Sequence, residues 1–457
     1  MPTPFPFLPS THAKASIRLA RRLPAAVALC AWLAASSHAQ TLQEAMAHAY
    51  GSHPALGAQR ANVRALDQDV DSALAGWRPT VSVSTGTGRH TNAYALNDGP
   101  RISSDRNPAD LRVSASQPLL NWTTGPAVDA AEARVRQGRA DLLASEQNVL
   151  FDAASAYLNV LQYRKLLALH EANERSLARQ VAYRSEHFQR RLGTRTELAQ
   201  AQARHAAAVA QLNRVRTELD SYGSAFLRTI GMPAGQDLGF PNGLPTLPEN
   251  LEPIIANAAY NMPAVRSAYY GAQAARADAQ AAKGRLMPSV SLEASGAWTR
   301  NPEATMRSQR DASVQLTLRI PIYQGGAEWA GVRGSKQREI QQQEQLRNSR
   351  LQARYDASDA WNKLQAARAE IKAFETAIAA NKVAYEGVSE QHAVLGELTL
   401  IEVLNAQQEL FLSEVSLVQA RTQAVLSHLR LLAVQGRLTA EGLGLSVAGH
   451  PAADMLQ

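Results

Sequence analysis

The chain has 457 residues, of which 45% are hydrophobic and 19% are charged, and its formal net charge at pH 7 is +7. This length can bury a large core or form two or three ordinary domains. No dense basic patch with interleaved aromatic residues occurs, so nucleic acid is not expected as a partner. The single cysteine excludes an internal disulfide.

Residues 1–39 have the pattern of a secretory signal peptide. Four basic residues precede an apolar run at 23–35, and "SSHAQ" supplies a small-residue cleavage site that ends at Ala39. The mature chain is expected to begin at Gln40, and the loss of four basic residues lowers its net charge from +7 to +3. Cys30 lies in this segment and follows Leu29, which does not fit a lipid-anchor signal. No later stretch has 18 continuous apolar residues, so no helical membrane span is expected.

The first half of the mature chain, residues 40–232, predicts helices that flank a pair of strands. A helix is expected over about 42–75, ending before "GWRP". Strands follow at 80–88 and 110–119, and the polar, Gly- and Pro-marked segment between them predicts a surface loop. A helix-type run near 126–192 follows, which at 1.5 Å per residue makes a rod of about 100 Å. A second helix is expected at 197–232.

The second half, residues 251–436, repeats this order after the connecting segment 233–250, and a tail at 437–457 follows it. It predicts a helix, strands at 289–298 and 312–320, a long helix at 327–395 and a helix at 399–436. Pro79, Pro118, Pro288 and Pro321 are expected at strand boundaries. Matched residues are equally spaced in both halves: Pro54–Pro79 and Pro263–Pro288 span 25 residues, and Pro118–Gly193 and Pro321–Gly396 span 75.

Each predicted strand has the length that crosses an outer membrane when it is tilted. Only a closed barrel can hold strands in lipid, and four strands cannot close one. Two chains would give eight strands and a filled interior, whereas three chains would give twelve and room for a pore. A small soluble sheet that caps a coiled-coil rod is the alternative. The signal peptide, the duplication and the rod length together favour the barrel.

The signal peptide, the duplicated "P-x-V/L" strand pairs and the repeated "G-x-x-T" helix turns resemble the TolC family of outer-membrane export channels. The likeness covers residues 41–436. It implies a mainly α protein whose homotrimer forms a 12-stranded outer-membrane barrel, four strands per chain, that continues into a periplasmic α-helical coiled-coil tunnel. It also implies an equatorial belt built from 233–250 and from parts of the tail after Gly436.

The resemblance further implies partners and site residues. The tunnel would dock an inner-membrane transporter, ABC-type or proton-driven, through a periplasmic adaptor protein. The helix turns would be the docking tips, with the glycines permitting the turns. These turn residues are Gly193, Thr194 and Thr196 in the first half and Gly396 and Thr399 in the second.

The family pattern places two acidic residues three apart, facing the lumen, just beyond the second turn. Glu402 matches the first position, and Asn405 stands at the second. Threefold symmetry would make Glu402 a ring of three carboxylates that attracts cations, whereas the alternative is an ordinary solvated carboxylate. Leu398 replaces the family's gate arginine, and Ala199 replaces an acidic partner of the first half. The closed-state contacts are therefore expected to differ.

No nucleotide, dinucleotide, hydrolase or metalloprotease motif occurs, so no enzyme activity and no cofactor are expected. The preferred interpretation is a passive exit duct, used in type I protein or toxin secretion because a lipid-anchor signal is missing. A small-molecule efflux duct is the alternative. An interpretation of another class is a surface coiled-coil stalk or adhesin that does not transport.

Overall fold

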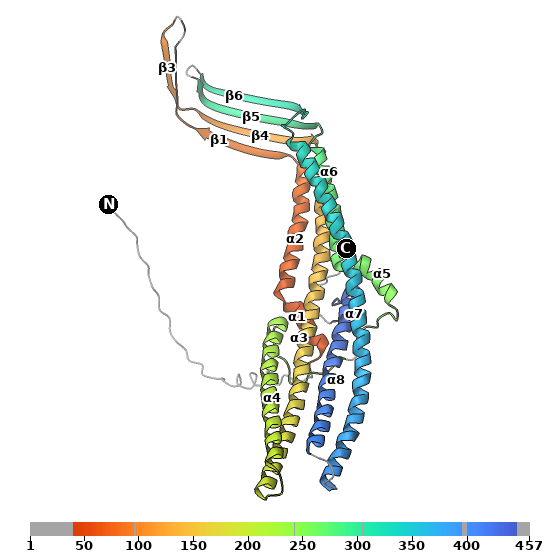
Figure 1. Ribbon diagram of the computed structural model, residues 1–457. Coiled ribbons are helices and arrows are strands. Elements are labelled where there is room, and N and C mark those ends of the chain that lie inside the picture. Colours follow the sequence, from red (N-terminus) through yellow and green to blue (C-terminus); the bar gives the residue numbers. More distant parts are fainter. Residues whose placement is uncertain are drawn as a thin grey trace, which may run out of the picture.

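The computed structural model describes residues 40–445, except positions 96, 98, 242, 304–305 and 395–399. In this part of the chain a long bundle of helices carries a curved sheet at one end (Figure 1). The predicted signal peptide at 1–39 and the tail residues 446–457 lie outside the described residues.

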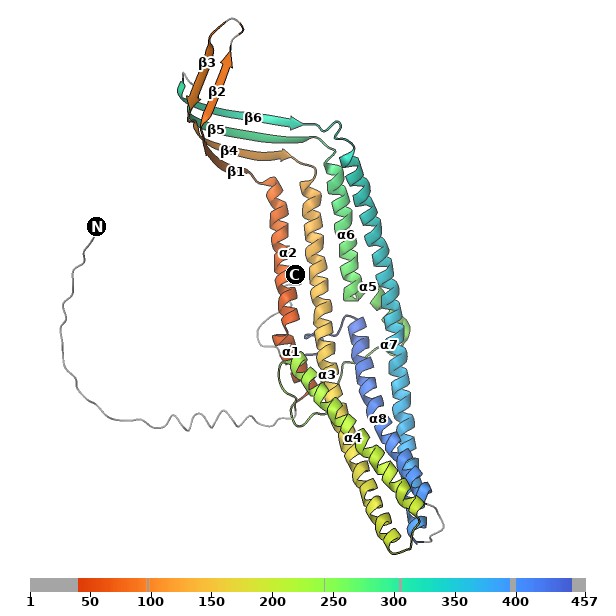
Figure 2. The same cartoon turned by 60° about the vertical axis from the view of Figure 1, so that its left-hand side comes forward.

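Two long helices form the length of the bundle. Helix α3 (Thr124–Gln189) has 66 residues and α7 (Ala327–Val394) has 68. Each packs along a shorter helix that follows it, α4 (Arg195–Ile230) and α8 (Leu400–Val434), and the two resulting hairpins form the end far from the sheet (Figure 2). None of the described helices is both long and apolar enough to cross a membrane.

The helix expected at 42–75 is interrupted, so the prediction of one continuous helix was wrong. It consists of α1 (Leu42–Ser52), α2 (Pro54–Leu74) and a 3₁₀ turn (Ala75–Trp77). The second half breaks in the same way, into α5 (Leu251–Asn261) and α6 (Pro263–Gly284). A residue before proline avoids helical dihedral angles. His53 and Met262 accordingly have ψ of 122° and 129°.

The internal repeat extends to side-chain contacts. Arg216 of α4 forms an ion pair with Glu171 of α3 at 3.2 Å, and Arg421 of α8 forms one with Glu375 of α7 at 2.9 Å. The two pairs lie within two residues of matched positions of the repeat, because 203 residues separate Gly193 from Gly396, 204 separate Glu171 from Glu375 and 205 separate Arg216 from Arg421. Both halves therefore use the same device to hold a long helix against its return helix.

The main sheet has four antiparallel strands in the order β1-β4-β5-β6. The segment expected to be a loop between β1 and β4 forms a hairpin, so that prediction was wrong. The loop signals Asn97, Gly99 and Pro100 fall between the two strands, while "HTNAYA" and "RISSDR" pair from His90–Arg106 to Ala95–Arg101. The strand bounds are β1 (Thr80–Thr87), β2 (His90–Ala95), β3 (Arg101–Arg106), β4 (Ala109–Leu120), β5 (Ser289–Glu303) and β6 (Met306–Arg319).

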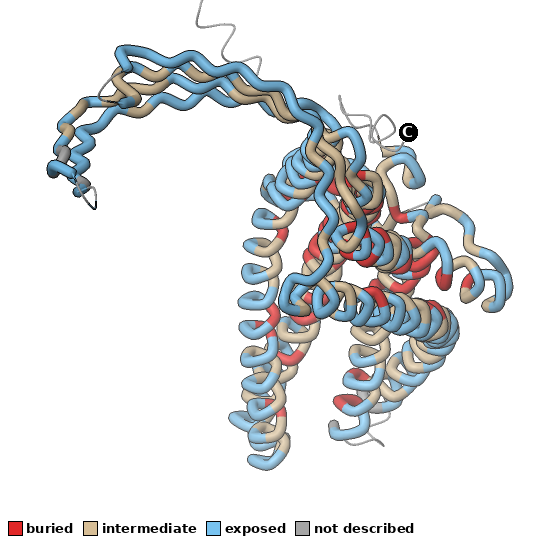
Figure 3. Tube along the Cα trace, turned by 90° about the horizontal axis from the view of Figure 1, so that it is seen from above, coloured by how far each residue is buried: buried red, intermediate tan, exposed pale blue. Residues whose placement is uncertain are grey.

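The register separates a polar face of the main sheet from an apolar face. Successive residues of a strand point to opposite faces, so directly paired residues share a face. One row across the sheet is Ser82, Ser114, Ser295 and Ser313, and the next row on the other face is Val83, Val113, Gly296 and Ala312. No described residue of the sheet is buried in the single chain (Figure 3). A sheet that exposes valines and leucines on a whole face requires an apolar surrounding on that side.

Three of the four strand-boundary prolines lie just outside strands. Pro79 and Pro288 directly precede β1 and β5, and Pro321 follows the end of β6. Pro118 instead lies within β4, close to its end, where the pairing with β5 shifts register between Pro118 and Leu120. Proline has no N–H for the ladder, so it is found where pairing begins, ends or is irregular.

The largest buried cluster surrounds the middle of α3 and joins it to α1, α4 and α8. The non-helical segment at 232–250 and the tail beyond Gly436 pack onto this cluster. Tyr157 of α3 donates its hydroxyl to the carbonyl oxygen of Gln40 at 2.8 Å and accepts from the N–H of Gly239 at 3.1 Å. Glu146 accepts from the N–H of Ala440 at 2.8 Å. These contacts tie both segments and residue 40 around the middle of the bundle.

Candidate functional site

The first candidate element is the turn between α3 and α4, at the tip of the bundle. The N–H of Leu192 bonds to the carbonyl of His187 at 2.9 Å and the N–H of Arg191 to that of Phe188 at 3.0 Å, which is the Schellman pattern. Arg191 adopts the left-handed conformation of this motif, with φ of 61°. Gly193 has no positive φ, so the prediction that it permits the turn was wrong.

Thr194 begins α4 as its N-cap. Its hydroxyl accepts from the N–H of Glu197 at 3.2 Å, and its own N–H donates to the Glu197 carboxylate at 3.3 Å, which completes a capping box. Glu197 also lies 4.0 Å from the guanidinium of Arg184. Thr196 is exposed. Gly396 and Thr399, the corresponding residues of the second turn, lie outside the described residues.

Apolar side chains are exposed around the first turn. Leu192 is 71% exposed, and Tyr183 and Phe188 on the last turns of α3 are also exposed. Their positions give the tip a partly apolar surface bordered by arginines. Exposed aromatic and aliphatic groups beside basic residues are the composition of a protein contact surface.

The second candidate element is the start of α8. Glu402 and Asn405 lie on its exposed side, whereas Val403 and Leu404 are buried. Asn405 is held by a contact: its side-chain oxygen accepts a hydrogen bond from Arg204 of α4 at 2.8 Å. The sequence placed Glu402 and Asn405 together as a lumen-facing pair. In the chain they share the exposed side, and Asn405 also links the two halves of the repeat.

Amide side chains continue this link along the seam where α8 meets α3. Gln407 is 9% exposed; its side-chain oxygen accepts from Gln180 at 2.8 Å and its nitrogen donates to Asn173 at 3.2 Å. Leu177 and Leu404 are buried together between these amides. Hydrogen-bonded amides in an apolar contact fix the register of two helices at a cost in stability.

A buried histidine lies above these amides. His170 of α3 is 7% exposed and its ring meets that of Phe411 of α8 edge to face, with centroids 5.0 Å apart. Burial lowers the pKa of His170 because it disfavours the charged imidazolium. A cavity of about 350 Å³ adjoins His170 and is also lined by Arg204 and Asn405, with no carboxylate among its lining residues. Water and a proton could therefore enter at this seam once it loosens.

Sequence reasoning missed the seam, although a signal for it was present. His170, Asn173, Leu177 and Gln180 follow the three- and four-residue spacing of a helix face that packs on another helix. Polar residues at such positions need partners in the facing helix. Leu404, Gln407 and Phe411 have the same spacing on α8, so the two series could have been matched.

The outer membrane efflux protein family model matches residues 28–227 and 254–437. The chain belongs to this family. The family contains the TolC channels, so the resemblance seen in the sequence is confirmed. Members of the outer membrane efflux protein family are outer-membrane channels of tripartite export systems and are not enzymes.

Relatives match over nearly the whole chain. The outer membrane efflux protein BepC of Brucella suis biovar 1 is 32% identical over 414 residues, covering 90% of this chain and 88% of BepC. Outer membrane protein TolC of Vibrio cholerae is 24% identical, covering 91% of this chain and 96% of that protein. The proteases secretion protein PrtF of Dickeya chrysanthemi is 25% identical, covering 82% and 84%.

The fold agrees with solved channels. The Campylobacter jejuni CmeC outer membrane channel superposes with a TM-score of 0.77 over 91% of this chain and 88% of CmeC, at 16% identity. The fold class predicted from the sequence is confirmed: a TolC-type helical tunnel joined to the strands of a barrel. Family membership also decides against the interpretation as a stalk that does not transport.

Proposed function

We propose that three copies of this chain close a 12-stranded barrel in the outer membrane, above a helical tunnel. The observation that carries the proposal is the main sheet itself. It has one apolar and one polar face, and its outer strands, β1 and β6, pair on one side only among the described residues. Unpaired strand edges are not tolerated in lipid, so β6 of one copy pairs with β1 of the next.

The number of copies follows from the size of the opening. Two copies give eight strands, whose interior side chains fill, and three give twelve, which leave a pore. The polar row that starts at Ser82 then faces the water-filled lumen, and the apolar row that starts at Val83 faces lipid. TolC-family channels form trimers, which supports this number.

The domain assignment follows the same plan. The signal peptide at 1–39 is removed near Ala39, and the two repeats at 40–232 and 251–436 each contribute half of the strands and half of the tunnel wall. The segment 233–250 and the described part of the tail, which wrap the middle of the bundle, form an equatorial belt. The helix tips then lie in the periplasm, because the sheet at the opposite end lies in the outer membrane.

The helix turns dock a periplasmic adaptor, and through it an inner-membrane transporter. The exposed side chains of Leu192 and Phe188 at the first turn support this role, since apolar groups at the end of a rod bury their surface only against a partner. The chain carries no nucleotide-binding motif, so the transporter supplies the energy and the duct works passively. Polar cargo that passes through the barrel avoids the unfavourable free energy of transfer from water into lipid.

The cargo of this duct is a protein exported by a type I system. The likeness to PrtF, whose name states protease secretion, supports this assignment. Small-molecule efflux is the second candidate, because BepC is named as an efflux protein and has the higher identity. The two candidates differ in what passes the duct and share the same architecture.

Two measurements test these proposals. Native mass spectrometry of the detergent-extracted protein should give the mass of three mature chains, and planar bilayers should show discrete openings. A monomer without conductance would overturn the channel. For the cargo, the native host without this chain should lose a secreted protein from its medium. Unchanged secretion combined with increased drug sensitivity would replace the secretion assignment with efflux.

A further inference from the structure

The apolar face of the main sheet carries two arginines at its far end, and the acidic residue in its paired rows is Glu303, opposite Met306 beyond the register shift. The pairing places Trp298 of β5 opposite Arg310 of β6, and Arg300 one row further out, opposite Ser308. Arg310 and Ser308 lie an even number of residues from Val314 and Leu316 on β6, so they share the same face of the sheet. Trp298 and Arg300 pair directly with Arg310 and Ser308 and therefore lie on this face too.

The other acidic residues of these rows are on the polar face. Asp110, Glu293 and Asp311 belong to rows of the polar face, and each of these rows also contains a serine or a glutamine. Glu293, for example, accepts a hydrogen bond from Gln315 at 3.1 Å. Glu303 is the acidic residue nearest to Arg300 and Arg310 along the pairing on their own face, and neither arginine forms an ion pair with it.

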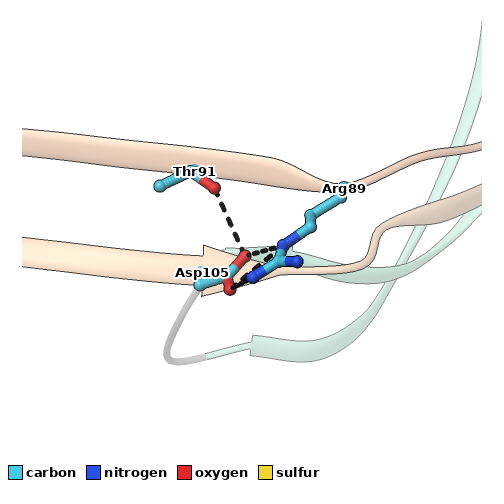
Figure 4. Close-up of polar contacts among 3 residues, drawn as sticks. All are labelled: Arg89, Thr91 and Asp105. Atoms are coloured by element: carbon cyan, nitrogen blue, oxygen red, sulfur yellow. Dashed lines mark hydrogen bonds and ion pairs between the residues drawn. The ribbon is translucent and has the colours of Figure 1, made fainter.

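Both arginine side chains are exposed, and neither forms an ion pair with any residue in the described ranges. The neighbouring β2–β3 hairpin shows the opposite arrangement (Figure 4). There Arg89 forms an ion pair with Asp105, which also accepts from Thr91 at 3.4 Å. The chain thus neutralises an arginine of the hairpin and leaves Arg300 and Arg310 for an external anion.

The depth of these arginines fits the outer boundary of the membrane. Ten residue steps separate Arg310 from Ile320 at the helix end of the sheet, which is about 34 Å of strand and, at a tilt of about 40°, about 25 Å of depth. The apolar band of an outer-membrane barrel has about this height. Arginine is costly at the midplane and nearly neutral at the boundary, where tryptophan is enriched.

We propose that Arg300, Arg310 and Trp298 bind the phosphate of a phosphorylated lipid headgroup in the outer leaflet. This inference rests on the proposed barrel, which turns the apolar face towards lipid. Guanidinium groups match phosphate oxygens in a forked geometry, and the tryptophan ring covers the junction of headgroup and acyl chain. The occupant is a lipid, because the apolar face continues directly below the two arginines.

The test measures retention of diphosphorylated lipid A by the purified trimer, using native mass spectrometry and a dephosphorylated lipid A as the comparison probe. The variant R300Q/R310Q removes both charges from the apolar face. The matched control R112Q/R319Q removes two arginines from the polar face of the same sheet, one on β4 and one on β6. We expect the first variant to bind the phosphorylated lipid about 25-fold more weakly, at about fivefold for each arginine, and the control to bind as wild type does.

Each outcome decides between the explanations. Equal retention of the two lipids by wild type, or an equal loss in the two variants, would overturn the phosphate site. Competition by inorganic phosphate at millimolar concentration would overturn the commitment to a lipid. The same preparations are tested in planar bilayers: trimers that conduct but ignore lipid phosphate reject this inference alone. Loss of trimers and conductance in wild type would instead reject the proposed function.

Discussion

Arg204 of α4 donates a hydrogen bond of 2.8 Å to the side-chain oxygen of Asn405 of α8. The contact joins the first half of the repeat to the second, close to the tip where α8 begins. Together with the Gln407 amide between Gln180 and Asn173, it holds the two helical hairpins side by side. A tunnel that widens by separating its hairpins must break these bonds, so the seam sets part of the cost of opening.

Replacing Arg204 by alanine should favour the open channel. The lost hydrogen bond is worth about 1 kcal/mol, which is about a fivefold rise in the open-to-closed ratio for each chain. Single-channel recordings measure it as longer openings. The matched control is R216A, which breaks the ion pair with Glu171 inside one hairpin and leaves the seam intact. Equal opening in both variants would show that the seam does not control the gate.

Acidification should open the seam through His170. Burial lowers its pKa, so in the separated state the ring takes a proton near its ordinary pKa of about 6.5 while the closed state does not. His170 thus stabilises the closed state fully above pH 6.5. As the pH falls from there towards the lowered pKa, the closed-to-open ratio decreases, by at most about tenfold per pH unit.

Recordings at pH 7.5 and pH 5 test this dependence. Wild type should open more often at the lower pH, and H170Q should not respond. The control is H428Q, because His428 is partly buried and also has a lowered pKa but contacts the Pro245 carbonyl, away from the seam. If H170Q keeps the full response, another group senses the pH.

Much of the fold could be predicted from the sequence because the repeat supplied two independent copies of each signal. Strand alternation located β1 and β6, and the absence of proline located α3 and α7. The hairpin β2–β3 was missed because "HTNAYA" and "RISSDR" consist mainly of polar residues, which leaves no sustained apolar alternation to detect. The break before Pro54 was visible as His-Pro and was not used.

The candidate site was harder to predict, because its contacts join residues far apart in the chain. The spacing of Gly193 and Thr194 indicated a turn but not its geometry, which depends on hydrogen bonds to His187 and Phe188. The partner of Asn405 lies on another helix, 201 positions away. Sequence periodicity shows which residues share one face of a helix. Which other helix that face contacts depends on the packing of the folded chain.

The turn geometry gives a further prediction: R191G should stabilise the α3–α4 turn. A side chain in the left-handed conformation costs about 1 kcal/mol relative to glycine, so local opening should become about fivefold rarer. Hydrogen exchange at the turn amides should slow accordingly. R190G is the control, because Arg190 has φ of −78°: glycine there relieves no left-handed strain and also removes the ion pair with Glu186, so exchange should not slow. Faster exchange in R191G would contradict the assigned conformation.

Tyr157 should be required for the belt around the bundle. Its buried hydroxyl joins the Gln40 carbonyl and the Gly239 N–H, and Y157F would leave these backbone groups without that partner, at about 1–3 kcal/mol. Limited proteolysis should then cut the 233–250 segment faster. Y163F is the control, since Tyr163 stacks on Tyr222 with centroids 4.6 Å apart and does not contact that hydroxyl network. Equal cleavage in both variants would show that the hydroxyl does not anchor the belt.

Glu402 should contribute to cation selectivity if three copies bring its carboxylates together. It is exposed in the first turn of α8, and a ring of three negative charges at a constriction attracts cations and repels anions. E402Q should therefore lower the ratio of potassium to chloride permeability, measured from reversal potentials in a salt gradient. E409Q removes an equally exposed carboxylate two turns further along α8 and serves as the control.

The salt dependence distinguishes a ring from a solvated side chain. Charges held together at a narrow opening keep their effect at ionic strengths where isolated surface charges are screened, because the Debye length falls from about 10 Å at 0.1 M to about 3 Å at 1 M salt. The effect of E402Q should thus persist at 1 M potassium chloride, while that of E409Q should disappear. If both effects vanish together, Glu402 is an ordinary surface carboxylate and the selectivity of the duct arises in the polar lumen of the barrel.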